Sequence, residues 1–213
     1  MKFYDWSAAN PRRVRIYLAE KGIEVPIEDA GDPDKPVLKP AFLAAHSHRR
    51  VPLLVLDDGT EIGEAMAICR YFETLHPEPP LMGTDARDRA LVEMWEGIAD
   101  VEGMHAVTEV FRNSTERFVD RALAGIPEPI AQIPELIERG KQRVRLFYEK
   151  IDRQLADNEF LAGPRFSVAD ITTLCTVDFA EFAELKIPGT CSHVARWHEI
   201  VSARPSAKLS PTG

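Results

Sequence analysis

Cysteine is scarce in this sequence of 213 residues, and its three copies lie far apart. Cys69, Cys175 and Cys191 are odd in number and form no CxxC motif. This excludes the disulfide framework of small secreted domains and the redox motif of disulfide oxidoreductases. We therefore expect three reduced, buried thiols.

Long apolar runs and several enzyme motifs are also missing. No uninterrupted apolar segment approaches the roughly 20 residues of a membrane-spanning helix, so no membrane partner is expected. A strand pattern begins at Lys2 and leaves no place for a signal peptide, so the expected location is cytoplasmic. A glycine-rich phosphate loop, HExxH and GxSxG are absent, which excludes the most readily detected nucleotide-binding, zinc-protease and hydrolase motifs.

A basic surplus is absent as well. The chain has 26 Lys and Arg against 34 Asp and Glu, a net charge of −8, which argues against a nucleic-acid partner. One short basic stretch, residues 46–50, suits a small anion better than a polyanion. Its His46 and His48 have no evident further ligands, whereas structural zinc takes four, so no metal is expected.

Residues 1–76 alternate between strand and helix patterns. Strands are predicted over 2–5, 24–29, 52–56 and 60–63, and helices over 10–22, 41–45 and 65–75. Asn10 before Pro11 is typical of an N-cap and first helical position. Gly22 is typical of a helix end. The predicted order is therefore βαβ, a loop, then ββα.

The sequence after a proline-rich linker over 77–83 has helical patterns throughout, which predicts an all-helical second domain over 84–213. Helices are predicted over 84–112, 135–155 and 167–183, with a last one starting near Cys191. The first should bury Leu91, Trp95, Ile98 and Val101, and the third Leu174, Cys175, Phe179 and Phe182. Ser167 and Asp170 have the spacing of a capping box.

Three stretches carry a family resemblance: ANPRRVRIYLAEKG after the first strand, VPLLVLDDGTEIGEAMAICRYFE, and FLAGPRFSVADI. In this order and spacing, the chain resembles the cytosolic glutathione transferases of the bacterial type. The resemblance implies an α/β, thioredoxin-like N-terminal domain (βαβ-ββα) followed by an all-helical C-terminal domain. It also implies a homodimer, a cis peptide bond before Pro52, and glutathione as co-substrate without a metal.

Such an enzyme must convert the glutathione thiol into a thiolate that attacks an electrophile. A free thiol titrates near pH ~8.5, and a helix N-terminus lowers that value. The loop at residues 7–10 lies where the first strand meets the first helix. Relatives carry a serine two residues before the asparagine, where this chain has Ala8. Three donors therefore stay open: the Ser7 hydroxyl, which is the favoured one, Asn10, and the backbone amides alone.

The resemblance also implies a glutathione site at His48, Arg50, Val51, Pro52, Glu64 and Ala65. The Val51 backbone should pair with glutathione as an added strand. Glu64 should meet the γ-glutamyl end. Ala65 replaces a serine, so one hydroxyl contact is missing, although its backbone N–H at a helix start still suits a carboxylate.

A small hydrophobic electrophile should bind between the domains, beside Met104, His105, Thr108 and Phe111. The family pattern places Asp100 near the glutathione of a second subunit. Trp95 and its neighbour Met94 widen the apolar face of this helix, which favours a homodimer through it.

Three functions stay open. The first is a transferase that conjugates glutathione to electrophiles. Ala65 and the missing serine favour a second, a glutathione-binding protein with little catalysis. A third, glutathione-dependent peroxidase or disulfide reductase chemistry, would have to run on glutathione's own thiol, because the first loop has no cysteine.

Overall fold

A computed structural model describes residues 1–34 and 37–209. Its N-terminal part is a four-stranded sheet in the order β2-β1-β3-β4. The strands are β1 (Lys2–Asp5), β2 (Ile27–Asp29), β3 (Leu53–Val55) and β4 (Glu61–Gly63). β1 pairs in parallel with β2 and antiparallel with β3, and β3 pairs antiparallel with β4.

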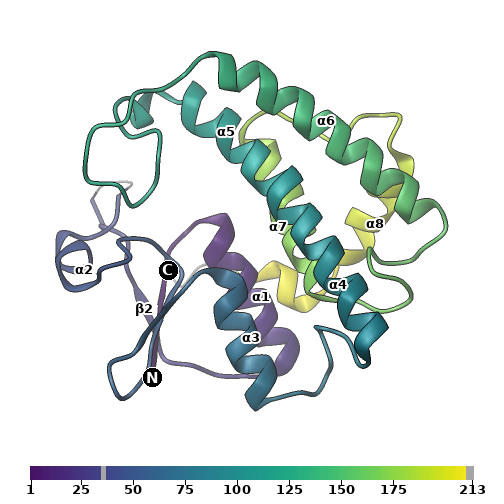
Figure 1. Ribbon diagram of the computed structural model, residues 1–213, viewed down its shortest axis with the longest axis horizontal. Helices are drawn as coiled ribbons and strands as arrows, with labels where there is room; N and C mark the ends of the chain where they lie inside the picture. The colour runs from purple at the N-terminus through teal and green to yellow at the C-terminus, as the bar shows by residue number, and fades with distance from the viewer. Residues whose placement is uncertain (35–36, 210–213) are drawn as a thin grey trace.

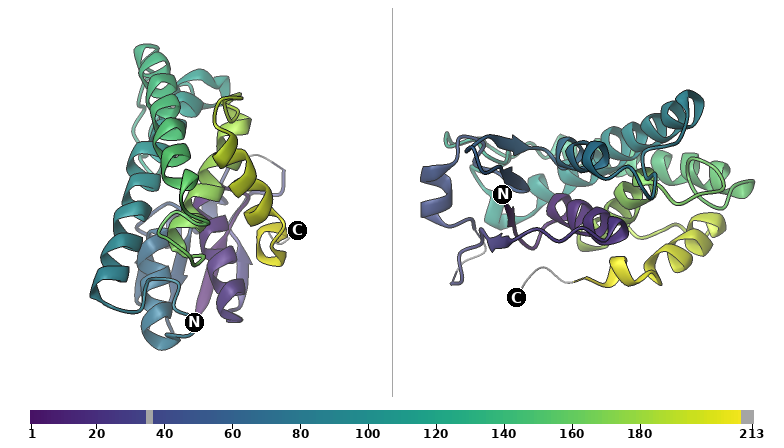
Figure 2. Two further views of the ribbon diagram at one scale, coloured as in Figure 1. Left: turned by 90° about the vertical axis from the view of Figure 1, so that its right-hand side faces the viewer. Right: turned by 90° about the horizontal axis from the view of Figure 1, so that it is seen from below.

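Three helices accompany this sheet: α1 (Ala9–Lys21), α2 (Pro40–Ala45) and α3 (Ala65–Leu75). α1 and α3 pack against each other, and α2 lies at the far end of the molecule from the helical half (Figures 1 and 2). The predicted βαβ-ββα order is confirmed; β1 has the predicted bounds, and β2, β3 and β4 are shorter than predicted.

The start of α1 differs from the sequence prediction. Its N-cap is Ala8, which has extended backbone and makes no side-chain cap. The Ala8 N–H donates to the Trp6 carbonyl at 2.8 Å, and the Ala8 carbonyl accepts from the Arg12 N–H at 3.2 Å. The helix therefore begins before Asn10, which is its second residue rather than its cap. Gly22 ends the helix at φ 64°, as predicted.

The helical half begins with a long rod made of α4 (Ala86–Ile98), a π-helical turn η1 (Ala99–Met104) and α5 (His105–Ser114) (Figure 1). The prediction of one regular helix over 84–112 is corrected by this turn. Gly103 lies inside η1, where a Cβ would sit 2.9 Å from both the Phe147 ring and the Thr176 methyl group. The missing side chain lets the turn approach two neighbouring helices.

The remaining helical elements are η2 (Glu116–Phe118), α6 (Glu135–Ala156), α7 (Val168–Phe182), α8 (Ser192–Ser202) and the short η3 (Pro205–Lys208). α7 contacts α1, α4, α5 and α8 and thus joins the two halves. η3 packs on α1, where Arg204 Nη2 lies 2.6 Å from Glu20 Oε2. In the part of the chain that is described, no helix is long and apolar enough to span a bilayer.

Burial follows the predicted pattern in part: Trp95 is buried, Leu91, Ile98 and Phe179 are partly buried, and two predicted core residues are exposed. Leu174 and all three cysteines are buried, and the cysteines are free thiols, as predicted. Phe182 is 80% exposed because α7 ends there, beyond its last core contact. Val101 is 54% exposed because it falls in the π-helical turn, which breaks the predicted helical period.

Candidate active site

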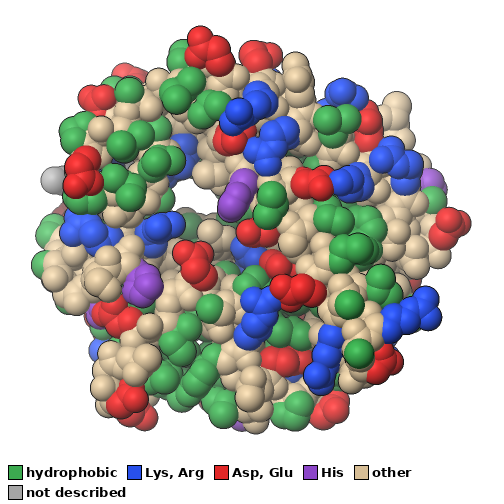
Figure 3. Space-filling model, in the orientation of Figure 1, with side chains coloured by type: hydrophobic (Ala, Val, Ile, Leu, Met, Phe, Trp, Pro, Cys, Tyr) green, Lys and Arg blue, Asp and Glu red, His purple; other side chains and the backbone are tan. Residues whose placement is uncertain are grey.

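The amino end of α1 points toward a space bordered by α5 and the segment 115–134 (Figure 1), and the molecular surface is open there (Figure 3). Arg12 in the first turn of α1 binds Asp178 of α7, with Nη1 and Oδ2 2.5 Å apart. On the other side, a Cβ added to Gly125 would lie 2.7 Å from the Arg50 side chain. The opening is therefore enclosed by both halves of the chain.

The loop before α1 is held from inside the protein. Buried Asp5 accepts hydrogen bonds from the Trp6 N–H at 2.7 Å and from Arg15 Nη1 at 2.6 Å. Burial raises the pKa of Asp5, and the Arg15 charge opposes that shift. A Cβ at Gly31 would lie 2.2 Å from the Trp6 indole nitrogen, so only glycine leaves room for that ring. Ser7 follows as an exposed residue.

Asn10 belongs to a network that crosses between the halves. Arg13, only 4% exposed, donates from Nη1 to Asn10 Oδ1 at 3.0 Å and to Asp100 Oδ1 at 2.7 Å. Its Nη2 donates to Glu96 Oε1 at 2.6 Å, and burial raises the pKa of Glu96 against the effect of Arg13. A guanidinium only donates, so the Asn10 oxygen must face Arg13 and its NH₂ group faces away.

Several donors at this helix start have no partner among the described residues. They are the Ser7 hydroxyl, the Asn10 NH₂ group and the backbone N–H groups of Ala9 and Asn10. The first N–H groups of a helix lack intrahelical partners and carry its positive dipole end. The geometry suits an anion such as a thiolate.

Val51 lies beside this loop. The antiparallel register pairs Tyr4 with Leu53, so the start of β3, which Val51 and Pro52 precede, lies at the end of β1 from which the loop leaves. Within the described chain, neither the Val51 N–H nor its carbonyl has a hydrogen-bond partner. The Val51–Pro52 peptide bond is cis. These two free groups can pair with the backbone of an extended peptide.

The other predicted glutathione residues gather at the start of α3. Glu64 is the N-cap, its φ of 63° is rare for a non-glycine residue, and such strained residues cluster at functional sites. Its Oε1 lies 4.0 Å from Arg50 Nη1, and both side chains are exposed. The His48 ring lies against Gly63, where a Cβ would meet Nδ1 at 3.0 Å. Ala65 is buried as the first residue of α3.

A cavity of about 340 Å³ lies between α5 and the segment 115–134. Of the four residues predicted beside the electrophile, His105 and Thr108 line it. Met104 does not, because it is 3% exposed in the core. Phe111 does not line it either, because it packs between the rings of Phe118 and Phe179.

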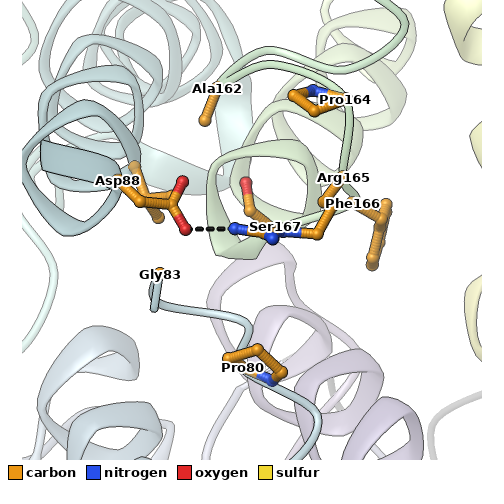
Figure 4. A pocket seen from close by; sticks show the side chains of 9 residues that line it. Pro80, Gly83, Asp88, Ala162, Pro164, Arg165, Phe166 and Ser167 are labelled. Carbon is orange, nitrogen blue, oxygen red and sulfur yellow. Dashed lines mark hydrogen bonds and ion pairs between the residues drawn. The ribbon is translucent and has the colours of Figure 1, made fainter. Parts of the chain in front are cut away.

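A second hollow is too small to be a substrate site. It has a volume of about 10 Å³ and lies between the loops around Pro80 and Pro164, crossed by the ion pair of Asp88 and Arg165 (Figure 4). That is space for about one water molecule. Among residues 1–34 and 37–209, no three His, Cys, Asp or Glu side chains gather into a metal-binding group.

Arg13 and Glu96 were not predicted as site residues from the sequence. An arginine three residues after Asn10 was a weak signal, because its partners lie 83 and 87 residues further along the chain. Asp100 turns toward Arg13 of its own chain. Its Oδ2 also lies 3.7 Å from His105 Nε2, and its carbonyl accepts the His105 N–H across the π-helical turn.

Comparison with known proteins agrees with this geometry. Residues 3–80 match the family model described as "Glutathione S-transferase, N-terminal domain", and residues 134–199 match "Glutathione S-transferase, C-terminal domain". Glutathione S-transferase 2 of Saccharomyces cerevisiae is 31% identical, over 98% of this chain and 88% of its own length.

Solved structures agree as well. A glutathione S-transferase domain-containing protein of Marinobacter aquaeolei VT8 is 36% identical, with a TM-score of 0.85 over 97% of this chain and 99% of its own. The glutathione S-transferase Gtt2 of Saccharomyces cerevisiae is 30% identical, with a TM-score of 0.84 over 98% of this chain and 99% of its own. On sequence, fold and site geometry together, this chain belongs to the glutathione S-transferase family.

Proposed function

We propose that this protein is a glutathione transferase that stabilises the thiolate of glutathione at the start of α1 and conjugates it to an electrophile. The observation that carries the proposal is the juxtaposition of free donors at Ala9 and Asn10 with the unpaired backbone of Val51. A peptide that pairs with Val51 would lie alongside the loop that precedes α1. Its cysteine sulfur would then meet the donors.

The reaction is a nucleophilic substitution. The glutathione thiol gives its proton to solvent, and the sulfur forms a bond to an electrophilic carbon. The bond from that carbon to the leaving group breaks, and the leaving group departs with the electron pair. A hydrogen-bond donor beside the sulfur favours the thiolate and thereby raises the fraction of reactive glutathione at neutral pH.

We assign the donor role to Asn10 ahead of Ser7, which reverses the preference drawn from the sequence alone. Arg13 holds the Asn10 oxygen and turns its NH₂ group away. The Ser7 side chain is exposed, and no contact in the described chain orients it. The γ-glutamyl end binds at Glu64 and the Ala65 N–H, and the glycine carboxylate at Arg50 with His48 nearby. The electrophile enters beside His105 and Thr108.

Ala65 keeps a second function open, that of a glutathione-binding protein with little turnover. It offers only its backbone N–H where a serine would add a hydroxyl, a loss of at most about 1.5–3 kcal/mol for a bond to a charged group. Peroxidase or disulfide reductase chemistry would use glutathione itself, since the three cysteines of this chain are buried.

Glutathione is expected to raise the melting temperature, and Glu64→Gln to reduce that rise. A ligand at about 100 times its Kd adds roughly 2.7 kcal/mol to the native state. The variant removes the charge that meets the glutathione ammonium group. The measurement is a thermal shift with and without 10 mM glutathione, a deliberately high dose. Glu159→Gln, an exposed change after α6, is the control. If glutathione does not raise the melting temperature of the unmodified protein, the proposed site is wrong.

We also propose a homodimer in the cytoplasm. Trp95 packs into the core at 8% exposure, but Met94 and Val101 on the same rod remain 47% and 54% exposed, and exposed apolar surface favours association. Sedimentation velocity at micromolar concentration is expected to give twice the chain mass of 23.9 kDa. A single species at the monomer mass would overturn the dimer.

The three free, buried cysteines suit a reducing compartment.

A further inference from the structure

Two arginines pack on two phenylalanine rings at the end of α5, and a third, Arg121, follows in the same segment. The guanidinium carbon of Arg112 lies 4.2 Å from the centre of the Phe118 ring. That of Arg117 lies 4.8 Å from Phe118 and 5.2 Å from Phe111. Burial lowers the pKa of Arg112, and the positive charges of Arg121 and Arg117 lower it further. The three side chains therefore lie close enough to repel one another.

No carboxylate neutralises this cluster. Within the described part of the chain, Arg112, Arg117 and Arg121 are all without an ion-pair partner. Arg112 donates to the carbonyls of Ala122 and Arg121, which anchors the segment. Arg117 is exposed, its guanidinium lies over the two rings, and it makes no hydrogen bond with its side chain among the described residues. In a protein of net charge −8, an unpaired positive cluster is the natural place for an anion.

The cluster adjoins the proposed site of the reacting sulfur. Phe111 packs on Phe179 with ring centres 5.0 Å apart. The preceding residue, Asp178, binds Arg12 in the first turn of α1. Thr108, which lines the cavity, lies about one helical turn before Phe111 on α5. The rings of Phe179, Phe111 and Phe118 thus form a continuous row that begins next to Asp178, the partner of Arg12, and ends at the arginines.

We propose that the electrophile is a planar apolar molecule that carries an anionic group, a carboxylate or a sulfonate, which pairs with Arg117 while the planar body lies in the cavity beside His105 and Thr108. This inference rests on the proposed transferase function. The proposed glutathione site assigns the two carboxylates of glutathione to Arg50 and to the start of α3, in the N-terminal half of the chain. The arginine cluster is therefore left for the second substrate.

The test compares 4-chloro-3,5-dinitrobenzoate with its neutral methyl ester. In each case a C–S bond forms at the chlorine-bearing carbon, chloride leaves with the electron pair, and the thiol proton goes to solvent. Each kcat/KM is divided by the uncatalysed rate constant. We expect a preference for the acid of about tenfold that disappears in Arg117→Gln and is retained in Arg153→Gln, an exposed control on α6.

Two results would overturn the inference: an equal loss for acid and ester in Arg117→Gln, or a change in the KM for glutathione instead. If the unmodified protein conjugates neither compound, the proposed transferase function fails for this substrate type. In that case the anion site is tested without catalysis, by calorimetric measurement of the binding of 3,5-dinitrobenzoate and its methyl ester to the glutathione-loaded protein. Tighter binding of the acid that depends on Arg117 supports the anion site, and equal or undetectable binding of the two refutes it.

Discussion

Asp170→Ala is expected to lower the melting temperature by about 10 °C. Asp170 is fully buried at the start of α7 and accepts four hydrogen bonds. Oδ1 accepts from the Leu161 N–H at 3.0 Å and from Trp197 Nε1 at 2.9 Å. Oδ2 accepts from the N–H and the hydroxyl of Ser167, both at 3.0 Å.

The magnitude follows from what the substitution leaves behind. Breaking a buried polar network leaves its donors without acceptors and lowers the free energy of unfolding by about 3–5 kcal/mol. For a chain of this size, each kcal/mol shifts the melting temperature by about 2–4 °C. Calorimetry at pH 7 is the measurement. Ser167→Ala, which removes one hydroxyl from the same network, is expected to cost about 1 kcal/mol. A shift for Asp170→Ala no larger than that of Ser167→Ala would contradict the network.

The same network has a pH signature. Burial raises the pKa of Asp170 to about 6, although the hydrogen bonds from Leu161, Trp197 and Ser167 act to lower it. In the unfolded chain an aspartate titrates near pH ~3.9, so the native state binds the extra proton between these values. The contribution of Asp170 to the free energy of unfolding is therefore fully present below about pH 4 and declines as the pH rises to about 6. Asp170→Ala should lack that decline.

Asn10→Ala is expected to raise the pKa of bound glutathione by about one unit, because it removes the donor that favours the thiolate. One unit corresponds to about 1.36 kcal/mol and to a tenfold smaller thiolate fraction below the pKa. Conjugation at neutral pH should slow accordingly. Thermal stability should change little, because Asn10 does not cap α1 and Arg13 keeps its bonds to Glu96 and Asp100.

The measurement is a titration of the thiolate absorbance of the bound complex. Ser7→Ala is the matched variant in the same loop and is expected to leave the pKa unchanged. A raised pKa in Ser7→Ala, with none in Asn10→Ala, would transfer the role to Ser7. If neither variant moves the titration, the backbone N–H groups of Ala9 and Asn10 hold the sulfur, and the assignment of Asn10 is wrong.

Elements with local causes could be predicted from the residues alone. Gly22 ends α1 because glycine adopts a left-handed conformation without a Cβ clash. Ser167 and Asp170 start α7 because their side chains reach each other's backbone within three residues. The succession of strands and helices in residues 1–76 followed from patterns of apolar residues over short windows, and the reduced cysteines from their number and spacing. These features need no knowledge of what lies elsewhere in the chain.

The arrangement of residues around the opening could not be predicted in this way, because it depends on contacts between distant parts of the chain. Asn10 looks like a cap in sequence, yet buried Arg13 takes its oxygen because Glu96 and Asp100 of the helical half hold that arginine in place. Likewise, the π-helical turn at 99–104 depends on the close approach of two other helices at Gly103. A contact with a partner more than 80 residues away produces no periodic pattern in the sequence around either residue. Site chemistry built from such contacts therefore becomes visible only once the chain is folded.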